Sequence, residues 1–200
     1  MDKRMQIDKT RAAIIGILAL TGTKVLRTKL VKLVYMADNR FYEFTGRTIT
    51  GNLYMWDHFG PNAVGNAIAN EANELSRQSK VRMSVHPSMV DGDSYEYWVD
   101  DADTSWEAVE SLLDEGERQI IVDVTREFGR QGINTLVKKS RETSPFHNAQ
   151  QYDLLQFEQL DRSIRMKEKV DSEGDFLEEV EIALKEADED QWIWDDEPGH

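Results

Sequence analysis

The strongest hydrophobic pattern in this chain lies between residues 28 and 61. Its first half repeats apolar residues every three or four positions, which places them on one face of a helix from about Arg27 to Phe44. The residues on this face are Leu30, Leu33, Val34, Ala37, Phe41 and Phe44. Gly46 then stands where a helix can end in the left-handed conformation that glycine adopts easily. We expect the rest of the chain to pack around this helix.

The same periodicity predicts further helices along the chain. They are expected over residues 8–20, 61–78, 104–128, 132–139 and 152–169, with a smaller amphipathic helix over 176–184. Pro61 suits the first position of a helix, and Thr104 and Glu107 have the spacing of a capping box. The compact region is expected to end at residues 142–146, because Pro145 interrupts helical geometry.

Alternating residues predict a small amount of β-structure. Residues 48–56 are rich in β-branched and aromatic side chains, which is typical of a strand, here interrupted at Gly51. Residues 81–90 and 95–99 alternate on either side of a turn sequence and predict a β-hairpin, although Pro87 weakens its first strand. The whole pattern predicts a mainly α fold of the α+β kind, with about five to six helices and a small antiparallel sheet.

The chain changes character after residue 148. We predict a compact domain over residues 1–148 and a charged helical extension over residues 149–200 that ends in an acidic tail. The net charge of the protein is −14, but residues 1–80 hold 12 Lys and Arg against 7 Asp and Glu. Residues 171–200 instead hold 1 Lys against 13 Asp and Glu. Such a tail is either solvated or docks on a basic partner, and both alternatives stay open.

Composition limits the compartment and the chemistry. Cysteine is absent, which excludes disulfides, thiolate zinc sites and cysteine nucleophiles and fits a reducing cytoplasm. The apolar run over residues 12–20 follows basic residues as in a signal peptide. It is nevertheless too short for a bilayer, which takes about 20 residues. We therefore expect a cytoplasmic protein with no membrane partner.

A search for catalytic motifs finds none. The four histidines lack the spacing of a metal site. The chain has neither a phosphate-binding loop with its lysine nor a Gly-x-Ser-x-Gly elbow. We expect no metal, no cofactor and no enzymatic activity. One alternative is a hydrolase whose acids converge only in the fold, because Asp38 and Asp57 flank an aromatic run and could meet in space.

A basic set of residues suggests a DNA-binding alternative. The predicted helices on either side of Thr21–Thr23 are joined as in a helix-turn-helix motif. The second helix begins with basic residues, as a DNA-reading helix does. These residues are Lys24, Arg27, Lys29 and Lys32. A core helix with a solvated basic rim explains the same pattern, because this helix is strongly apolar and also carries Asp38 and Glu43.

Aromatic and polar residues near the organising helix are candidates for a partner-binding surface. They are Tyr35, Asp38, Asn39, Arg40, Tyr42, Asp57 and His58. Tyrosine, tryptophan and arginine are frequent anchors of protein interfaces. The alternative is that the aromatic residues of this region, above all Tyr54 and Trp56, fill the core. Trp192 and Trp194 in the acidic tail are a further candidate, and would dock either on this chain or on a partner.

Three motifs in a fixed order carry a resemblance to a known family. They are Leu30 to Asp38 with its Lys-Leu-Val-Tyr-Met-Ala-Asp sequence, Gly46 to Gly51 with its Thr-Gly pair, and Trp56 to Pro61 with its Gly-Pro close. Over about residues 10–148, the chain resembles the Panacea domain of the SocA- and GepA-like antitoxins of bacteria and their phages. It departs from the usual pattern at residues 57–60. It also has Phe146 at a position where tryptophan is more usual.

The resemblance implies a mainly helical domain with a small sheet and no defined catalytic set. It also implies a cytoplasmic antitoxin that neutralises an adjacently encoded toxin by binding it, in some members by handing the toxin to a protease. The expected partners are therefore a cognate toxin and, in the adaptor case, a protease. The acidic tail lies outside the resemblance, and the oligomeric state is left open.

Overall fold

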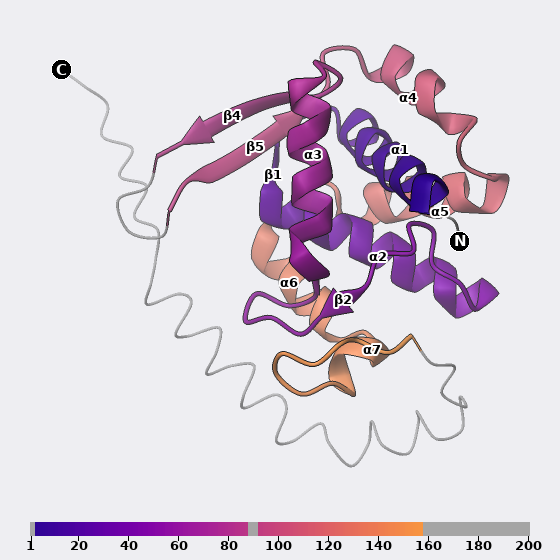
Figure 1. Ribbon diagram of the computed structural model, residues 1–200, viewed down its shortest axis with the longest axis vertical. Coiled ribbons are helices and arrows are strands. Elements are labelled where there is room, and N and C mark those ends of the chain that lie inside the picture. Colours follow the sequence, from indigo (N-terminus) through magenta and orange to yellow (C-terminus); the bar gives the residue numbers. More distant parts are fainter. Residues whose placement is uncertain (1–2, 88–91, 158–200) are drawn as a thin grey trace. The chain divides into compact units, whose positions relative to one another are not determined.

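The computed structural model describes residues 3–87 and 92–157, which lie within one compact unit (Figure 1). The helices are α1 (Lys3–Thr21), α2 (Arg27–Thr45), α3 (Ala67–Arg77), α4 (Ala102–Glu110), α5 (Glu115–Phe128), α6 (Ile133–Arg141) and α7 (Ser144–His147), with a 3-10 helix η1 (Val64–Asn66). The strands are β1 (Val25–Leu26), β2 (Tyr54–Met55), β3 (Asn62–Ala63), β4 (Arg82–His86) and β5 (Ser94–Trp98). The predicted mainly helical fold with small antiparallel sheets is confirmed.

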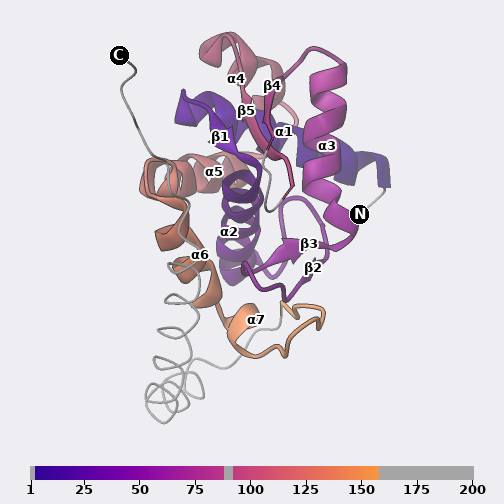
Figure 2. The ribbon, with the colours of Figure 1, turned by 90° about the vertical axis from the view of Figure 1, so that its left-hand side faces the viewer.

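Helix α2 lies at the centre of the fold, in contact with α1, α3, α5 and α6 (Figures 1 and 2). Every residue from Leu30 to Asn39 is buried, because neighbouring elements surround the helix on several sides. It ends as predicted at Gly46, which has a φ of 74° and donates its N–H to the carbonyl of Tyr42 at 2.9 Å. The prediction that this helix organises the core is confirmed.

Helix α1 begins at Lys3, five residues earlier than predicted. Its buried residues Ala12 to Ala19 pack against α4 and α5 as well as α2. The close approach of α4 depends on Gly16, because a Cβ at this position would lie 2.7 Å from the ring of Trp106. A helix buried over so much of its length explains the apolar run that imitates a signal peptide.

The larger sheet has the antiparallel strand order β1-β5-β4. The predicted hairpin is confirmed, and Pro87 does not interrupt it because β4 ends at His86. Strand β1 occupies the connection between α1 and α2 and pairs with β5 through Val25 and Tyr97. The two helices are therefore joined by a sheet strand and not by the tight turn of a helix-turn-helix motif.

The smaller sheet, β2 with β3, differs from the prediction at both ends. The strand expected over residues 48–56 is reduced to Tyr54–Met55, because the preceding residues turn inward to bind α2. The helix expected from Pro61 begins only at Ala67, since Asn62–Ala63 pair with β2. Gly65 and Asn66 then have φ values of 63° and 55°, which delay regular helix further.

The single helix predicted over residues 104–128 is wrong, because the chain forms α4 and α5 separately. Asp101 caps α4 by accepting the N–H of Thr104 at 3.0 Å. Asp114 and Glu117 form a reciprocal capping box that starts α5. The predicted capping box of Thr104 and Glu107 thus lies inside α4. Asp101 caps α4 and Asp114 caps α5 in its place.

The chain after α7 was predicted to be helical from residue 152. Its described part is instead extended, and Leu154 forms an antiparallel bridge with Met55 of β2. The remainder of that predicted helix lies outside the described residues. So do the amphipathic segment over residues 176–184 and the tryptophans Trp192 and Trp194.

Candidate functional site

Helix α2 carries five of the predicted partner-binding residues, and three of them are buried. Tyr35 and Asp38 are fully buried, and Asn39 is buried. Arg40 and Tyr42 are half-buried. The Tyr35 hydroxyl lies 2.5 Å from the hydroxyl oxygen of Thr143, so even its polar end is engaged inside the protein. The polar surface predicted for this helix is thus mostly a polar interior.

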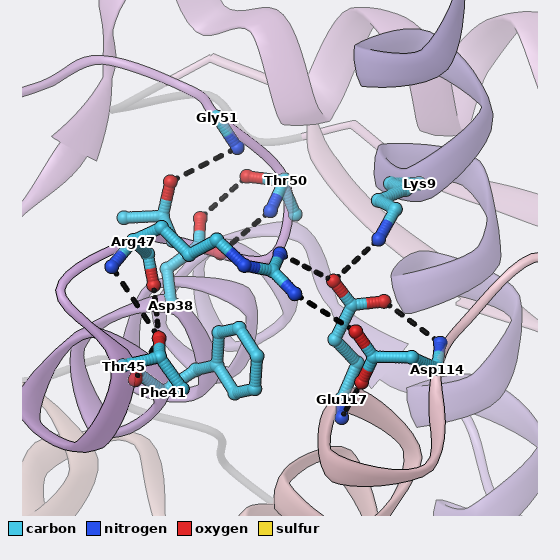
Figure 3. Close-up of polar contacts among 10 residues, drawn as sticks. Lys9, Asp38, Phe41, Thr45, Arg47, Thr50, Gly51, Asp114 and Glu117 are labelled. Carbon is cyan, nitrogen blue, oxygen red and sulfur yellow. Dashed lines mark hydrogen bonds and ion pairs between the residues drawn. The ribbon is translucent and has the colours of Figure 1, made fainter. Parts of the chain in front are cut away.

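Asp38 holds the loop that follows α2 (Figure 3). One carboxylate oxygen accepts the backbone N–H of Thr50 at 2.8 Å. The other accepts the hydroxyl groups of Thr50 and of Tyr54, the latter at 2.6 Å. Burial raises the pKa of Asp38 to about 6, against the opposing effect of these hydrogen bonds. At neutral pH Asp38 is therefore an ionised group whose donors fix the loop to the helix.

Glu117 is the centre of a second buried network beside the first (Figure 3). One of its oxygens accepts from Lys9 of α1 and from Arg47, the latter at 2.8 Å. The other accepts the N–H of Asp114 at 3.0 Å as part of the capping box. Arg47 also donates to the Asp114 carboxylate at 2.8 Å. The loop after α2 is thereby tied to α1 and to the start of α5.

Asp57 belongs to a separate part of the structure. It is half-buried, and its side chain accepts from the amide of Asn62 at 3.1 Å. Since the partners of Asp38 are Thr50 and Tyr54, the described structure does not bring the two acids into one hydrogen-bonded pair. The described residues also contain no group of three or more side chains that could hold a metal ion. No geometry here favours the hydrolase alternative.

A depression of about 190 Å³ lies between α2 and the chain of α6 and α7. Its lining includes two predicted residues, Asn39 and Arg40. Arg40 is paired with Glu127 at 2.7 Å, and Lys139 on the opposite wall is paired with Glu142 at 2.7 Å. Because these charges are already compensated within the chain, the depression offers little to attract a charged ligand.

Residues 153–155, called the third strand below, pair with the free edge of β2 through an isolated antiparallel bridge between Leu154 and Met55. The N–H of Trp56 donates to the carbonyl of Asp153 at 2.9 Å, and the N–H of Leu155 donates to that of Tyr54 at 2.8 Å. Both ribbon views show this orange chain following α7 beside β2 (Figures 1 and 2). This segment was predicted as helix instead of strand. The alternation of apolar Leu155 and Phe157 with polar Gln156 is the sequence signal for it, and the structure buries Leu155 and half-buries Phe157.

The inner face of this three-stranded sheet is filled with aromatic rings. The Phe157 ring centroid lies 6.1, 5.3 and 5.9 Å from those of Tyr35, Tyr42 and Tyr54. Trp56 stacks on Phe146 with centroids 5.1 Å apart. The expectation that Tyr54 fills the core is met, because its side chain is fully buried. The apolar side chains on this face therefore pack against other side chains of the same domain.

The outer face of the same sheet carries a group of exposed apolar side chains, next to the polar Asn62 that lies opposite Met55. We define the outer sheet face as Leu53, Met55, Val64 and Leu154. The exposed fractions are 64% for Leu53, 39% for Val64 and 49% for Leu154, and Met55 is half-buried. Predicted residue His58 lies nearby on the surface, with its Nε2 atom 3.1 Å from the hydroxyl of exposed Tyr152.

The four basic residues considered for DNA binding do not share one surface role. Lys24 pairs with Glu96 at 3.6 Å and lies over the ring of Trp98, and Arg27 lies over the ring of Tyr95. Lys29 donates to the carbonyl of Gln131 at 2.7 Å.

Lys32 is buried and donates to the carbonyl of Pro61 at 2.6 Å. Its burial lowers its pKa to about 7. Lys32 is thus an interior group that holds the Gly60-Pro61 end of the third motif in place.

With the fold established, the chain can be compared with known families. The family described as antitoxin SocA-like, Panacea domain, matches residues 30–147. The chain belongs to this family. The match confirms the predicted resemblance and implies an antitoxin role with a cognate toxin as partner. No curated protein and no solved structure matches the chain.

The Panacea match covers the described structure from early α2 to the end of α7. It therefore includes Asp38, Arg47 and Glu117, whose networks hold the domain together. Helix α1 and the third strand both lie outside the match yet pack on it. No helix among the described residues is long and apolar enough to cross a membrane.

Proposed function

We propose that this Panacea protein neutralises its toxin by binding it directly, as a folded domain in the cytoplasm. The observation that supports this proposal is a contrast between the first family motif and the residues near the others. Asp38 is turned inward and satisfied by its own chain, while apolar residues outside the motifs, such as Leu53, face solvent. A surface of that kind is suited to contact with another protein.

A proteolytic adaptor is the second form of the same function. In that case the antitoxin binds the toxin and also presents it to a protease, for which the tail with Trp192 and Trp194 is the candidate contact. The two forms predict different fates of the toxin. Direct neutralisation leaves its amount unchanged, whereas an adaptor lowers it.

The test uses the protein encoded by the neighbouring reading frame. Expressed alone it should stop growth, and growth should recover when this chain is expressed with it. The two proteins should also co-purify in a defined ratio, and the amount of toxin should stay constant in a pulse-chase experiment. A neighbouring protein that is not toxic, or that does not bind this chain, would contradict the proposal.

The DNA-binding alternative receives no support from the described contacts. Lys32 lies inside the protein, Lys29 is engaged with Gln131, and the connection between α1 and α2 is a sheet strand. Charge reversal at Lys24 and Arg27, the two exposed members of the set, tests it directly. Unchanged operator binding by that variant would dismiss the alternative.

A further inference from the structure

The outer sheet face is built by strand geometry and not by chance exposure of single side chains. Leu53 and Met55 are two residues apart, so they project from the same face of β2. Leu154 is the bridge partner of Met55 across the third strand. Val64 follows β3 and donates its N–H to the carbonyl of Leu53 at 2.9 Å. Three chain segments thus bring four apolar side chains to one surface.

This surface differs from the ordinary scatter of exposed apolar residues. Isolated exposed residues are normal, but a contiguous group on a regular element usually marks an interaction site. Side chains that lie directly opposite each other on a sheet contact one another. Met55 and Leu154 therefore form a continuous apolar surface. Among the described residues, the inner face has buried apolar partners, whereas the outer face remains open.

The same surface is rigid before any partner arrives. Backbone hydrogen bonds join β2 to the third strand, and the stacked pair of Trp56 and Phe146 fixes the end of β2. Arg141 of α6 donates to the carbonyl of His58 in the loop that follows. A preformed surface loses little conformational entropy on binding, which favours a tight interface.

We propose that the outer sheet face is the surface with which this antitoxin binds its toxin. The proposal rests on the proposed function and adds the place and the chemistry of the contact. The partner it fits is the cognate toxin that the family implies, as a protein with an apolar patch and a basic surface. The apolar patch matches the four side chains, and the basic surface matches the net charge of −14 carried by this chain.

The first experiment places a charge in the proposed contact. The variants Leu53→Asp and Leu154→Asp should fold as the wild type does, because both side chains already face solvent. Each should weaken toxin binding by roughly 30-fold or more, as for an interface centre. Leu112→Asp is the matched control, since Leu112 is 46% exposed in the turn between α4 and α5. It should bind the toxin normally.

The second experiment uses the absence of cysteine from the chain. A thiol introduced by L154C or by L112C is the only one in its variant and can be alkylated selectively. Adding the toxin should slow alkylation roughly tenfold or more in L154C and leave L112C unchanged, as expected for a dry interface core.

The outcomes separate the two proposals. If the wild type binds and neutralises the toxin while both Asp variants do so equally well, the toxin contacts another surface and only the present inference is overturned. Unprotected alkylation of L154C in a formed complex would overturn it in the same way. If the wild type fails to bind the neighbouring protein at all, the proposed function fails with it.

Discussion

Two regions of this molecule place charged and apolar side chains in opposite ways. In the network around Asp38 and Glu117, these two carboxylates are fully buried and accept hydrogen bonds from donors of the same chain. On the outer sheet face, apolar side chains such as Leu53 and Leu154 are exposed. The difference teaches that the polarity of a residue alone does not show whether it lies on the surface of this chain. Acids such as Asp38 lie inside the domain, and the exposed apolar residues form the surface that we propose for the toxin.

The largest expected effect comes from breaking the inner region. Asp38→Ala leaves the N–H of Thr50 and the hydroxyl of Tyr54 buried without their acceptor. It should lower the free energy of unfolding by about 3 kcal/mol. Chemical denaturation measures this loss. Asp57→Ala is the control, because Asp57 is only half-buried, and it should cost about 1 kcal/mol or less. Equal losses in the two variants would mean that the buried network does not stabilise the domain.

Two neighbouring leucines in the third strand sharpen the comparison further. Leu155 is buried and Leu154 is 49% exposed, so adjacent residues report on the two faces of one sheet. Leu155→Ala should destabilise the protein by about 2–3 kcal/mol through the cavity it leaves. Leu154→Ala should change stability by less than about 0.5 kcal/mol.

The same two variants should rank in the reverse order for toxin binding at a temperature where both are folded. Leu154→Ala should weaken binding about tenfold, and Leu155→Ala should leave it near the wild-type value. Calorimetry on the purified pair provides the measurement. Identical behaviour of the two variants in both assays would remove the distinction between inner and outer face.

A smaller effect concerns the buried cation of the same helix. Burial lowers the pKa of Lys32 from 10.5 to about 7. Between these values the unfolded chain binds more protons than the folded one, so stability rises with pH. The contribution of Lys32 should amount to about 1 kcal/mol per pH unit between roughly pH 7.5 and 9.5.

Lys32→Met should remove this contribution while leaving the other titrations in place. The difference in unfolding free energy between wild type and variant is therefore the quantity to follow across the pH range. A difference that stays constant with pH would show that Lys32 remains protonated in the folded protein. Asp38 acts in the opposite sense, because its raised pKa makes stability fall as pH rises from about 4 to 6.

The smallest expected effect lies with the acidic tail. Replacing the acids of residues 171–200 by their amides should slow association with a basic toxin about tenfold at low salt and leave dissociation nearly unchanged. The difference should vanish at about 0.5 M salt, because screening shortens the range of the charges. Stopped-flow measurements at two salt concentrations suffice. An equal loss at both concentrations would indicate direct contacts by the tail instead of steering.

The central helix and the larger sheet were predictable because local signals and tertiary packing agree there. The apolar spacing from Leu30 to Phe41 predicted α2, and Gly46 predicted its end. The alternation of apolar and polar residues predicted the β4–β5 hairpin. The errors arise where a long-range contact overrides local preference. Thr50 leaves a strand-like sequence to bind Asp38, and Asp114 takes a capping role inside what reads as one continuous helix.

The candidate surface was harder to predict for a different reason. Periodicity already placed Asp38 next to the apolar stripe of its helix, but the sequence offers no sign that a carboxylate there has three donors. Conversely, Leu53 and Leu154 are ordinary apolar residues about a hundred positions apart. Only the bridge between Met55 and Leu154 shows that they share a face.

The third strand also bears on how such antitoxins can exchange parts. The family match stops at residue 147, yet Leu155 and Phe157 complete the sheet and the aromatic cluster beyond it. A recombination event that joined a foreign tail at the edge of the match would leave β2 with unpaired backbone groups and an emptied aromatic face. A tail joined after Phe157 would leave these contacts in place. The folded unit is therefore expected to end about ten residues later than the family match does.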